Sequence, residues 1–209
     1  MHLRKLYHCA VRLILASASP RRAELLRAAG YAFEAHPVDI NESQQDGESP
    51  PAYVERLARE KAMCALAELP DAKAGRYVLL AADTAVVVGD VILGKPHDAE
   101  DAARMLRLLS GRTHQVMTGV CLRTADKMLS HVEMSDVTFA MLSEDQIAWY
   151  VGSGEGRDKA GGYAIQGLAS RFIPRIDGSY SNVVGLPIAV LDDLIHRLTR
   201  TRTVLASGE

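Results

Sequence analysis

YVLLAADTAVVVGDVIL, residues 77–93, is the stretch of sequence that decides the fold. Its first part, 77–82, is an almost unbroken apolar run, as is typical of a strand buried on both faces. The shorter apolar runs 85–88 and 91–93 flank Gly89-Asp90, a dipeptide typical of a hairpin turn. We therefore expect a central strand that ends before Asp83-Thr84 and is followed by a small hairpin.

The segments on either side alternate between helix and strand patterns. Before residue 77 we expect a strand at 13–16, a helix capped by Ser19 and ended by Gly30, a strand at 31–38, a polar loop at 41–51 and a helix at 52–69. After residue 93 we expect a helix at 98–109, strands at 113–123 and 128–142, a helix at 143–150 capped by Ser143, a glycine-rich stretch at 152–167, a strand at 172–176 and a helix at 186–198. Because crossovers and hairpins both occur, the pattern predicts an α/β protein with a mixed twisted sheet flanked by helices.

The composition of the 209 residues excludes several classes of protein. A net charge of −2 gives no positive field to hold nucleic acid, and an aromatic content of 5% disfavours single-strand binding. No run approaches the roughly 20 apolar residues that a membrane span needs. Cys9, Cys64 and Cys121 are widely spaced and form no CxxC pair, which indicates reduced thiols in a cytoplasmic protein.

Ser17-Ala18-Ser19-Pro20-Arg21-Arg22 joins the first expected strand to the first helix. Backbone N–H groups at a helix start favour anions, and two hydroxyls and two guanidiniums accompany them here. The segment could bind a triphosphate; the alternative is an ordinary helix cap with solvated arginines.

Other candidate residues follow the central strand or precede it. The carboxylate of Asp83 could hold Mg²⁺ or orient a water, since ligands gather at the carboxyl ends of strands, and a turn-forming aspartate is the alternative. Lys95, in Gly94-Lys95-Pro96, could direct an ammonium at phosphate although P-loop spacing is absent, and a surface turn lysine is the alternative. Lys61, in the helix at 52–69, and Glu42, in the polar loop, are further candidates. The alternative for Lys61 is a side chain that extends to water, and the alternative for Glu42 is a solvated loop glutamate.

Residues 158–167, DKAGGYAIQG, combine glycines that permit close backbone approach with Gln166, whose amide suits the edge of a base. A flexible connector is the alternative. His114 lies in a strand-like run and is interpreted as structural, and neither GxSxG nor a cysteine nucleophile pattern occurs. Cations and carboxylates remain, the set needed for metal-assisted attack of water on phosphorus.

Six segments in the order of the chain resemble the Maf family. They are LILASASPRRAELL, RLAREKA, AADTAVVVGDVILGKP, LSGRTHQVMTGV, DKAGGYAIQG and GSYSNVVGLPI, from Leu13 to Leu191. The resemblance implies a Maf/ITPase-like α/β fold with two lobes around a deep cleft. It divides the chain into an extension at 1–12, one domain at 13–200 and a tail at 201–209.

The resemblance also implies a function: hydrolysis of a nucleoside triphosphate to the monophosphate and pyrophosphate, with a divalent cation, Mg²⁺ or Mn²⁺, as cofactor. The expected partner is the nucleotide, with neither nucleic acid nor membrane, in a cytoplasmic protein that is frequently a homodimer. An arginine directly after SP, the ADT triplet and KAGxYxIQG match the branch that resembles dTTP and UTP pyrophosphatases. The branch resembling enzymes for 7-methyl-GTP differs at all three places.

The functional positions of the Maf family can be matched to residues of this sequence one by one. The resemblance implies that Asp83 is the proton acceptor and, with Glu42, a metal ligand. Glu42, Lys61 and Lys95 join Asp83 in the catalytic set. The substrate-binding positions are Ser17, Arg21, Arg22, Thr84, Lys159 and Gln166, of which Arg21, Thr84 and Gln166 are linked to base selectivity. Asn41 stands where an acidic residue is common. The alternatives are a nucleotide-binding regulator of septum formation and a pyrophosphatase for a modified nucleotide.

Overall fold

The computed structural model of the chain describes residues 12–69 and 77–206, with side chains up to residue 198. Cys9, all but the last residue of the expected extension at 1–12, and residues 207–209 of the expected tail lie outside the described residues. No helix in the described part is long and apolar enough to cross a membrane.

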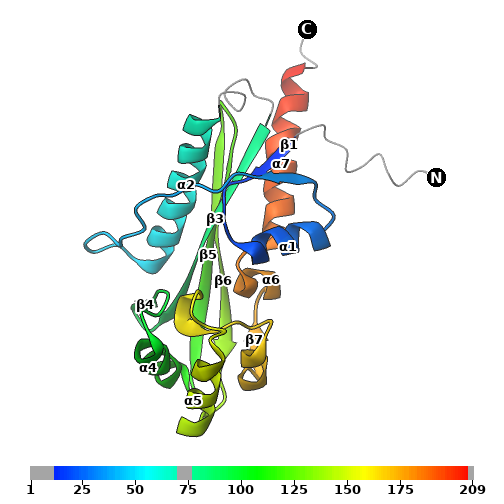
Figure 1. Cartoon of the computed structure of the whole chain (residues 1–209). Coiled ribbons are helices and arrows are strands. Elements are labelled where there is room, and N and C mark those ends of the chain that lie inside the picture. The colour runs from blue at the N-terminus through cyan, green and yellow to red at the C-terminus, as the bar shows by residue number, and fades with distance from the viewer. Residues whose placement is uncertain (1–11, 70–76, 207–209) are drawn as a thin grey trace, which may run out of the picture.

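A seven-stranded mixed sheet runs the length of the molecule (Figure 1). Its strands are β1 (Arg12–Leu15), β2 (Phe33–Ala35), β3 (Tyr77–Val88), β4 (Val91–Leu93), β5 (Thr113–Arg123), β6 (Met128–Thr138) and β7 (Arg175–Asp177). The strand order is β2-β1-β3-β5-β6-β7, and β4 pairs with β3 as a hairpin. β1 runs parallel to β2 and β3, and the other pairs are antiparallel. The expected mixed sheet and hairpin are confirmed.

Helices cover both faces of this sheet. They are α1 (Pro20–Ala28), α2 (Pro50–Glu68), α4 (Ala99–Leu109), α5 (Glu144–Ser153), α6 (Tyr180–Val184) and α7 (Ile188–Ala206), with the short 3₁₀ turns η2 (Ala160–Gly162) and η3 (Leu168–Phe172). Figure 1 shows α2 on one side of the sheet and α1, α6 and α7 on the other. Leu79 of β3 packs in one cluster with Ala58 of α2, and Leu80 packs in another with Leu26 of α1 and Leu191 of α7. Burial on both faces accounts for the unbroken apolar run of β3.

The far half of the sheet has a core of its own. Val86 of β3 and Val116 of β5 pack there with Leu106 of α4 and Tyr150 of α5. The long strands β3, β5 and β6 thus join two lobes with separate hydrophobic clusters, and the expected fold class is confirmed.

The expected end of the central strand before Asp83 is wrong. β3 continues through Asp83 and Thr84 to Val88, because β5 runs alongside and pairs Gly119 with Asp83 and Thr118 with Thr84. On the opposite edge of β3, pairing with β1 reaches Leu80 and pairing with β4 begins at Val86. The intervening residues face a gap between β1 and β4.

Several other boundaries also differ from the expected ones. The strand at 31–38 shrinks to β2, since the N–H of Tyr31 still bonds to the carbonyl of Leu26 at the end of α1. β6 stops at Thr138, and the expected strand at 172–176 is η3 followed by β7. α6 was not expected, and α7 begins at Ile188 and extends past residue 198. Ser143 caps α5 with a full capping box, whereas Ser19 holds the cap position of α1 without a side-chain bond.

Candidate active site

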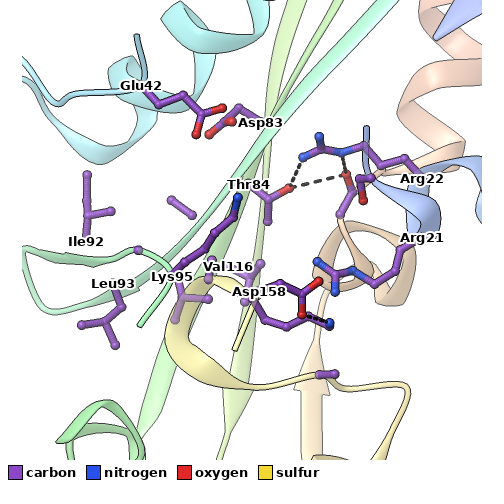
Figure 2. Close-up of a pocket in the computed structure, with 18 of the residues that line it drawn as sticks. Arg21, Arg22, Glu42, Asp83, Thr84, Ile92, Leu93, Lys95, Val116 and Asp158 are labelled. Atoms are coloured by element: carbon purple, nitrogen blue, oxygen red, sulfur yellow. Dashed lines mark hydrogen bonds and ion pairs between the residues drawn. The ribbon is translucent and has the colours of Figure 1, made fainter. Parts of the chain in front are cut away.

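A cleft of about 910 Å³ opens at the gap between β1 and β4, lined by residues of both lobes. All ten side chains expected from the sequence line it: Ser17, Arg21, Arg22, Glu42, Lys61, Asp83, Thr84, Lys95, Lys159 and Gln166. Figure 2 shows several of them converging from strands, helix and loops. The structure thus brings the predicted residues together, while their roles in catalysis stay predictions.

Asp83 and Thr84 enter the cleft from opposite faces of the sheet because successive side chains of a strand alternate. Asp83 points to the α2 side, where Gly119 lies opposite it on β5. A Cβ at Gly119 would lie 2.2 Å from the carbonyl oxygen of Val54, so a larger residue could not let α2 approach this closely. The close approach places Lys61 of α2 against Asp83, with 2.7 Å between Nζ and Oδ1.

Lys61 bridges two carboxylates. Its Nζ lies 2.5 Å from Oε1 of Glu42 and 2.7 Å from Oδ1 of Asp83. Both Lys61 and Asp83 are 8% exposed, so the charge-assisted contact between these two lies away from bulk water, whereas Glu42 is exposed. Burial would raise the pKa of Glu42, but the hydrogen bond and charge of Lys61, with the charge of Lys95, more than offset it and hold the pKa below its usual value. Glu42 is therefore ionised where it meets the ammonium.

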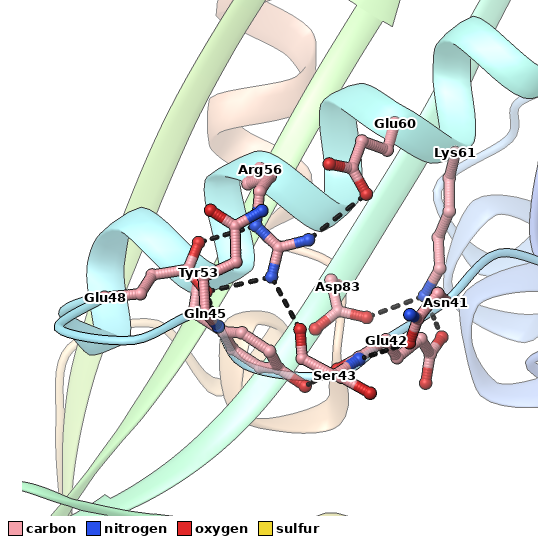
Figure 3. Close-up of polar contacts among 10 residues, drawn as sticks. All are labelled: Asn41, Glu42, Ser43, Gln45, Glu48, Tyr53, Arg56, Glu60, Lys61 and Asp83. Carbon is pink, nitrogen blue, oxygen red and sulfur yellow. Dashed lines mark hydrogen bonds and ion pairs between the residues drawn. The ribbon is translucent and has the colours of Figure 1, made fainter.

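The loop that delivers Glu42 is held by the same helix that carries Lys61 (Figure 3). Arg56 donates to both carboxylate oxygens of Glu48, at 2.6 and 2.8 Å, and to the carbonyl of Ser43 at 3.0 Å. The hydroxyl of Tyr53 donates to the carbonyl of Glu42 at 2.9 Å. Burial, together with the charges of Asp83 and Glu42, raises the pKa of Tyr53 to about 12. Sequence reasoning missed Tyr53, which lines the cleft.

Arg22 joins three segments on the other face of the sheet. Its Nε donates to the carbonyl of Gly185 at 2.8 Å, Nη1 to Ser17 Oγ at 3.0 Å and Nη2 to Thr84 Oγ1 at 3.1 Å. Burial lowers the pKa of Arg22, and the negative charge of Asp83 opposes that shift. Thr84 continues the network to Thr118 of β5, at 3.0 Å between hydroxyl oxygens. The carbonyl of Gly185 is a further acceptor for Arg22. Because it is a backbone group, no pattern of side chains in the sequence could have indicated it.

We call Ser17, Arg22, Lys61, Asp83 and Thr84 the paired face, because each makes polar contacts within the protein. The opposite wall, the open face, consists of Lys95, Lys159 and Gln166. Lys95 and Gln166 are exposed and make no hydrogen bond or ion pair with another described residue, whereas Lys159 pairs with Asp158. Figure 2 shows Lys95 pointing into the cleft toward Thr84.

Glycines allow the backbone segments of the open face to approach each other closely. The N–H of Gly161 donates to the carbonyl of Gly94 at 3.0 Å, which joins the segment of Lys159 to the loop of Lys95. Gly161 has a φ of +70°, and a Cβ there would lie 2.9 Å from Val86 Cγ1, so only glycine fits.

Arg21 belongs to α1 and lies beside the open face, near Asp158 (Figure 2). Burial lowers the pKa of Arg21, while the charges of Asp158 and Glu24 oppose the shift. Asp158 lines the cleft as well and was not among the expected site residues.

The carboxylates of Glu42 and Asp83 fit the divalent cation that the sequence led us to expect. Mg²⁺ is commonly held by one or two carboxylates together with substrate phosphates, and these two meet at one point. Among the described residues, no group of three or more His, Cys, Asp or Glu side chains could hold a metal ion. A divalent cation at this pair stays a prediction, and phosphate oxygens would have to complete its coordination.

Comparison with models of known protein families identifies the family of this chain. The model of the family described as Maf-like protein matches residues 12–198, almost the whole described part. The chain belongs to the Maf family. In this Maf protein the side-chain oxygen of Asn41 accepts the N–H of Ser43 at 2.9 Å and closes a turn in the loop of Glu42.

Curated relatives of this Maf protein carry the name dTTP/UTP pyrophosphatase. That of Anaeromyxobacter dehalogenans (strain 2CP-C) is 51% identical over 90% of this chain and 94% of its own. Those of Aliivibrio fischeri (88% of this chain, 97% of its own) and Shigella sonnei (91% and 94%) are each 48% identical. A solved structure, protein VC0702 from Vibrio cholerae, covers 69% of this chain and 73% of that one at 12% identity and a TM-score of 0.34, a likeness too low to bear on function.

Proposed function

We propose that this Maf protein hydrolyses dTTP and UTP to the monophosphate and pyrophosphate. The observation that carries the proposal is the meeting of Asp83, Lys61 and Glu42 at one point of a cleft that Arg21, Lys95 and Lys159 also line. A triphosphate needs such a surplus of cations, and its hydrolysis needs a carboxylate near the attacked phosphorus. The names of relatives 48–51% identical over most of the chain support the same reaction.

The reaction proceeds by attack of water on the α-phosphorus. The water oxygen forms a bond to phosphorus, its proton passes to the carboxylate of Asp83, and pyrophosphate leaves with the electrons of the broken P–O bond. Lys61 holds Asp83 in place, while the cations of the open face neutralise charge that develops on the phosphates. Glu42 and Asp83 would hold a divalent cation, which supplies further neutralisation of the phosphate oxygens.

Gln166 accounts for the choice of base. Uracil and thymine present an N–H between two carbonyls, and one amide can accept from the N–H and donate to a carbonyl. Cytosine has an unprotonated ring nitrogen and an amino group at those places, so the same contacts mismatch. Because the base edge matters more than the 2′-hydroxyl, both ribose and deoxyribose substrates are accepted.

Product analysis of dTTP and UTP turnover by ³¹P NMR tests the proposal. We expect monophosphate and pyrophosphate as the primary products. Orthophosphate with a nucleoside diphosphate would reject the assignment, and nucleotide binding without turnover would favour a regulatory protein instead. The homodimer and the cytoplasmic location stay predictions.

A further inference from the structure

The segment that carries Gln166 is held by two side chains that do not line the cleft, Tyr150 of α5 and Glu155 just after it. The hydroxyl of Tyr150 accepts the N–H of Ala164 at 3.0 Å and donates to Oε2 of Glu155 at 2.8 Å. Oε1 of Glu155 accepts the N–H of Leu168 at 2.9 Å. The backbone is thus fixed two residues before Gln166 and two residues after it.

Further contacts close the segment around Gln166. Oε2 of Glu155 also accepts the N–H of Ala169 at 3.4 Å, and the N–H of Gly167 donates to the carbonyl of Ala164 at 3.1 Å. A Cβ at Gly167 would lie 1.9 Å from Oε1 of Glu155, so the carboxylate occupies the space that a side chain would need. Ile165 is buried in the core beside Tyr150, whereas Gln166 is exposed and lines the cleft.

The protonation of Tyr150 and the charge of Glu155 make these contacts strong, and they hold the backbone segment in place. Tyr150 is 1% exposed, and burial raises the pKa of its hydroxyl above the usual range, so the phenol stays a donor to Glu155. A carboxylate that accepts backbone N–H groups forms stronger bonds than a neutral acceptor does. Loss of Glu155 would leave the part-buried N–H of Ala169 without this acceptor, which is costly, so the chain has little freedom to move while Glu155 is present.

We propose that Glu155, supported by Tyr150, is a positioning residue for base selection: it fixes the backbone from Ala164 to Ala169 so that Gln166 presents its amide to the base. The inference rests on the proposed function and adds a determinant of specificity that does not touch the substrate. Hydrogen-bond recognition needs its groups held within about 0.5 Å, which a loosened segment cannot provide.

Glu155→Gln tests the inference, because it keeps the size of the side chain and replaces one acceptor oxygen by a donor. Tyr150→Phe removes one oxygen from the same network. Glu144→Gln is the matched control: Glu144 lies in the first turn of α5, and its carboxylate bonds to Arg107 of α4. For each variant, kcat and KM are measured for UTP and CTP, with inhibition by inorganic pyrophosphate and the thermal unfolding midpoint.

We expect the UTP-to-CTP ratio of kcat/KM to fall about tenfold in Glu155→Gln, and by less in Tyr150→Phe. Pyrophosphate has no base, so its inhibition constant should stay within about twofold of wild type. Glu144→Gln should leave the ratio and the inhibition unchanged.

An unchanged ratio in folded Glu155→Gln would overturn the inference while the proposed function stands. Equal losses for UTP, CTP and pyrophosphate would overturn it too, since they indicate a general structural role. If Glu155→Gln does not fold, the ratio in Tyr150→Phe decides in the same way. Absence of turnover by the wild type would overturn the proposed function and this inference with it.

Discussion

The two faces of the cleft differ in how far the protein itself has fixed them. On the paired face, Ser17, Arg22, Lys61 and Asp83 are each 8–9% exposed and are bonded to protein partners. On the open face, Lys95 and Gln166 are exposed to solvent. Groups fixed before the substrate arrives stabilise developing charge without reorganising. Exposed side chains lose about 0.5–1.5 kcal/mol of rotamer freedom each when they are immobilised. We infer that the paired face serves the attack on phosphorus, while the open face holds the substrate, with Lys95 and Lys159 at the phosphates and Gln166 at the base.

Removal of the Asp83 charge should have the largest effect. Asp83→Asn keeps the size of the side chain but cannot accept the proton of water, so we expect kcat for dTTP to fall about 10²-fold or more. The thermal unfolding midpoint reports whether the fold survives. Asp136→Asn, an exposed change on β6 outside the cleft, should leave kcat near wild type. A loss of only a few-fold in Asp83→Asn would remove this carboxylate from the reaction.

His114, which contacts the glycine-rich segment of the open face, should contribute less to the stability of the protein in acid. His114 is 2% exposed and lies 2.8 Å, Nε2 to Oη, from Tyr163 of the glycine-rich segment, and burial lowers its pKa to about 4. Between about pH 6.5 and 4 only the unfolded state binds a proton at His114, so stability falls as pH falls through that window and levels off below it.

This loss can be measured from urea unfolding at pH 6.5 and 5. The His114 contribution to the free energy of unfolding should fall by about 1.5 kcal/mol between those values. His114→Gln should lack that part of the pH dependence, whereas His131→Gln, on the exposed side of β6, should retain it. Identical pH dependence in His114→Gln and wild type would contradict the assignment.

The sequence predicted which residues belong to the site better than it predicted how they are arranged. The motifs around Arg21, Lys95 and Gln166 indicated residues that do meet in one cleft. The strand pattern misplaced Asp83 at a strand end, because an isolated polar residue in an apolar run says nothing of the neighbour strand that continues the ladder. The pairing of Asp83 with Lys61 depends on Gly119, 36 positions further along the chain, and no local pattern could reveal it.

Supporting residues were missed for the same reason. Tyr53, Arg56 and Glu155 act through contacts with backbone groups in other segments, so their residue types carry no functional signal. Short elements such as β2 and η3 were also misjudged, since a few hydrogen bonds to distant residues decide their ends.

Lys95 tests whether the open face contributes charge independently of the base. Lys95→Ala should lower kcat/KM about tenfold, and by a similar factor for every nucleotide, since a phosphate contact is blind to the base. Arg175→Ala removes an exposed positive charge on β7 outside the cleft and serves as the control. A loss confined to one base would assign Lys95 to recognition of that base instead.

Arg56 should have the smallest effect, because it acts on the paired face through the loop of Glu42. Lysine cannot contact Glu48 at two oxygens and Ser43 at once, so Arg56→Lys should loosen that loop and lower kcat/KM about threefold for all nucleotides. Arg59→Lys, an exposed change on the same helix, should have no effect. A changed nucleotide ranking in Arg56→Lys would show that the two faces are not separate.

The division of labour between the faces is tested most directly by kcat/KM for dTTP, UTP, CTP and GTP in wild type, Asp83→Asn and Gln166→Glu. We predict that wild type prefers dTTP and UTP, that Asp83→Asn lowers all four values by a common factor, and that Gln166→Glu changes the ranking, because a carboxylate accepts hydrogen bonds but cannot donate them. Equal wild-type values for the four nucleotides, or a ranking that Gln166→Glu leaves unchanged, would contradict the account.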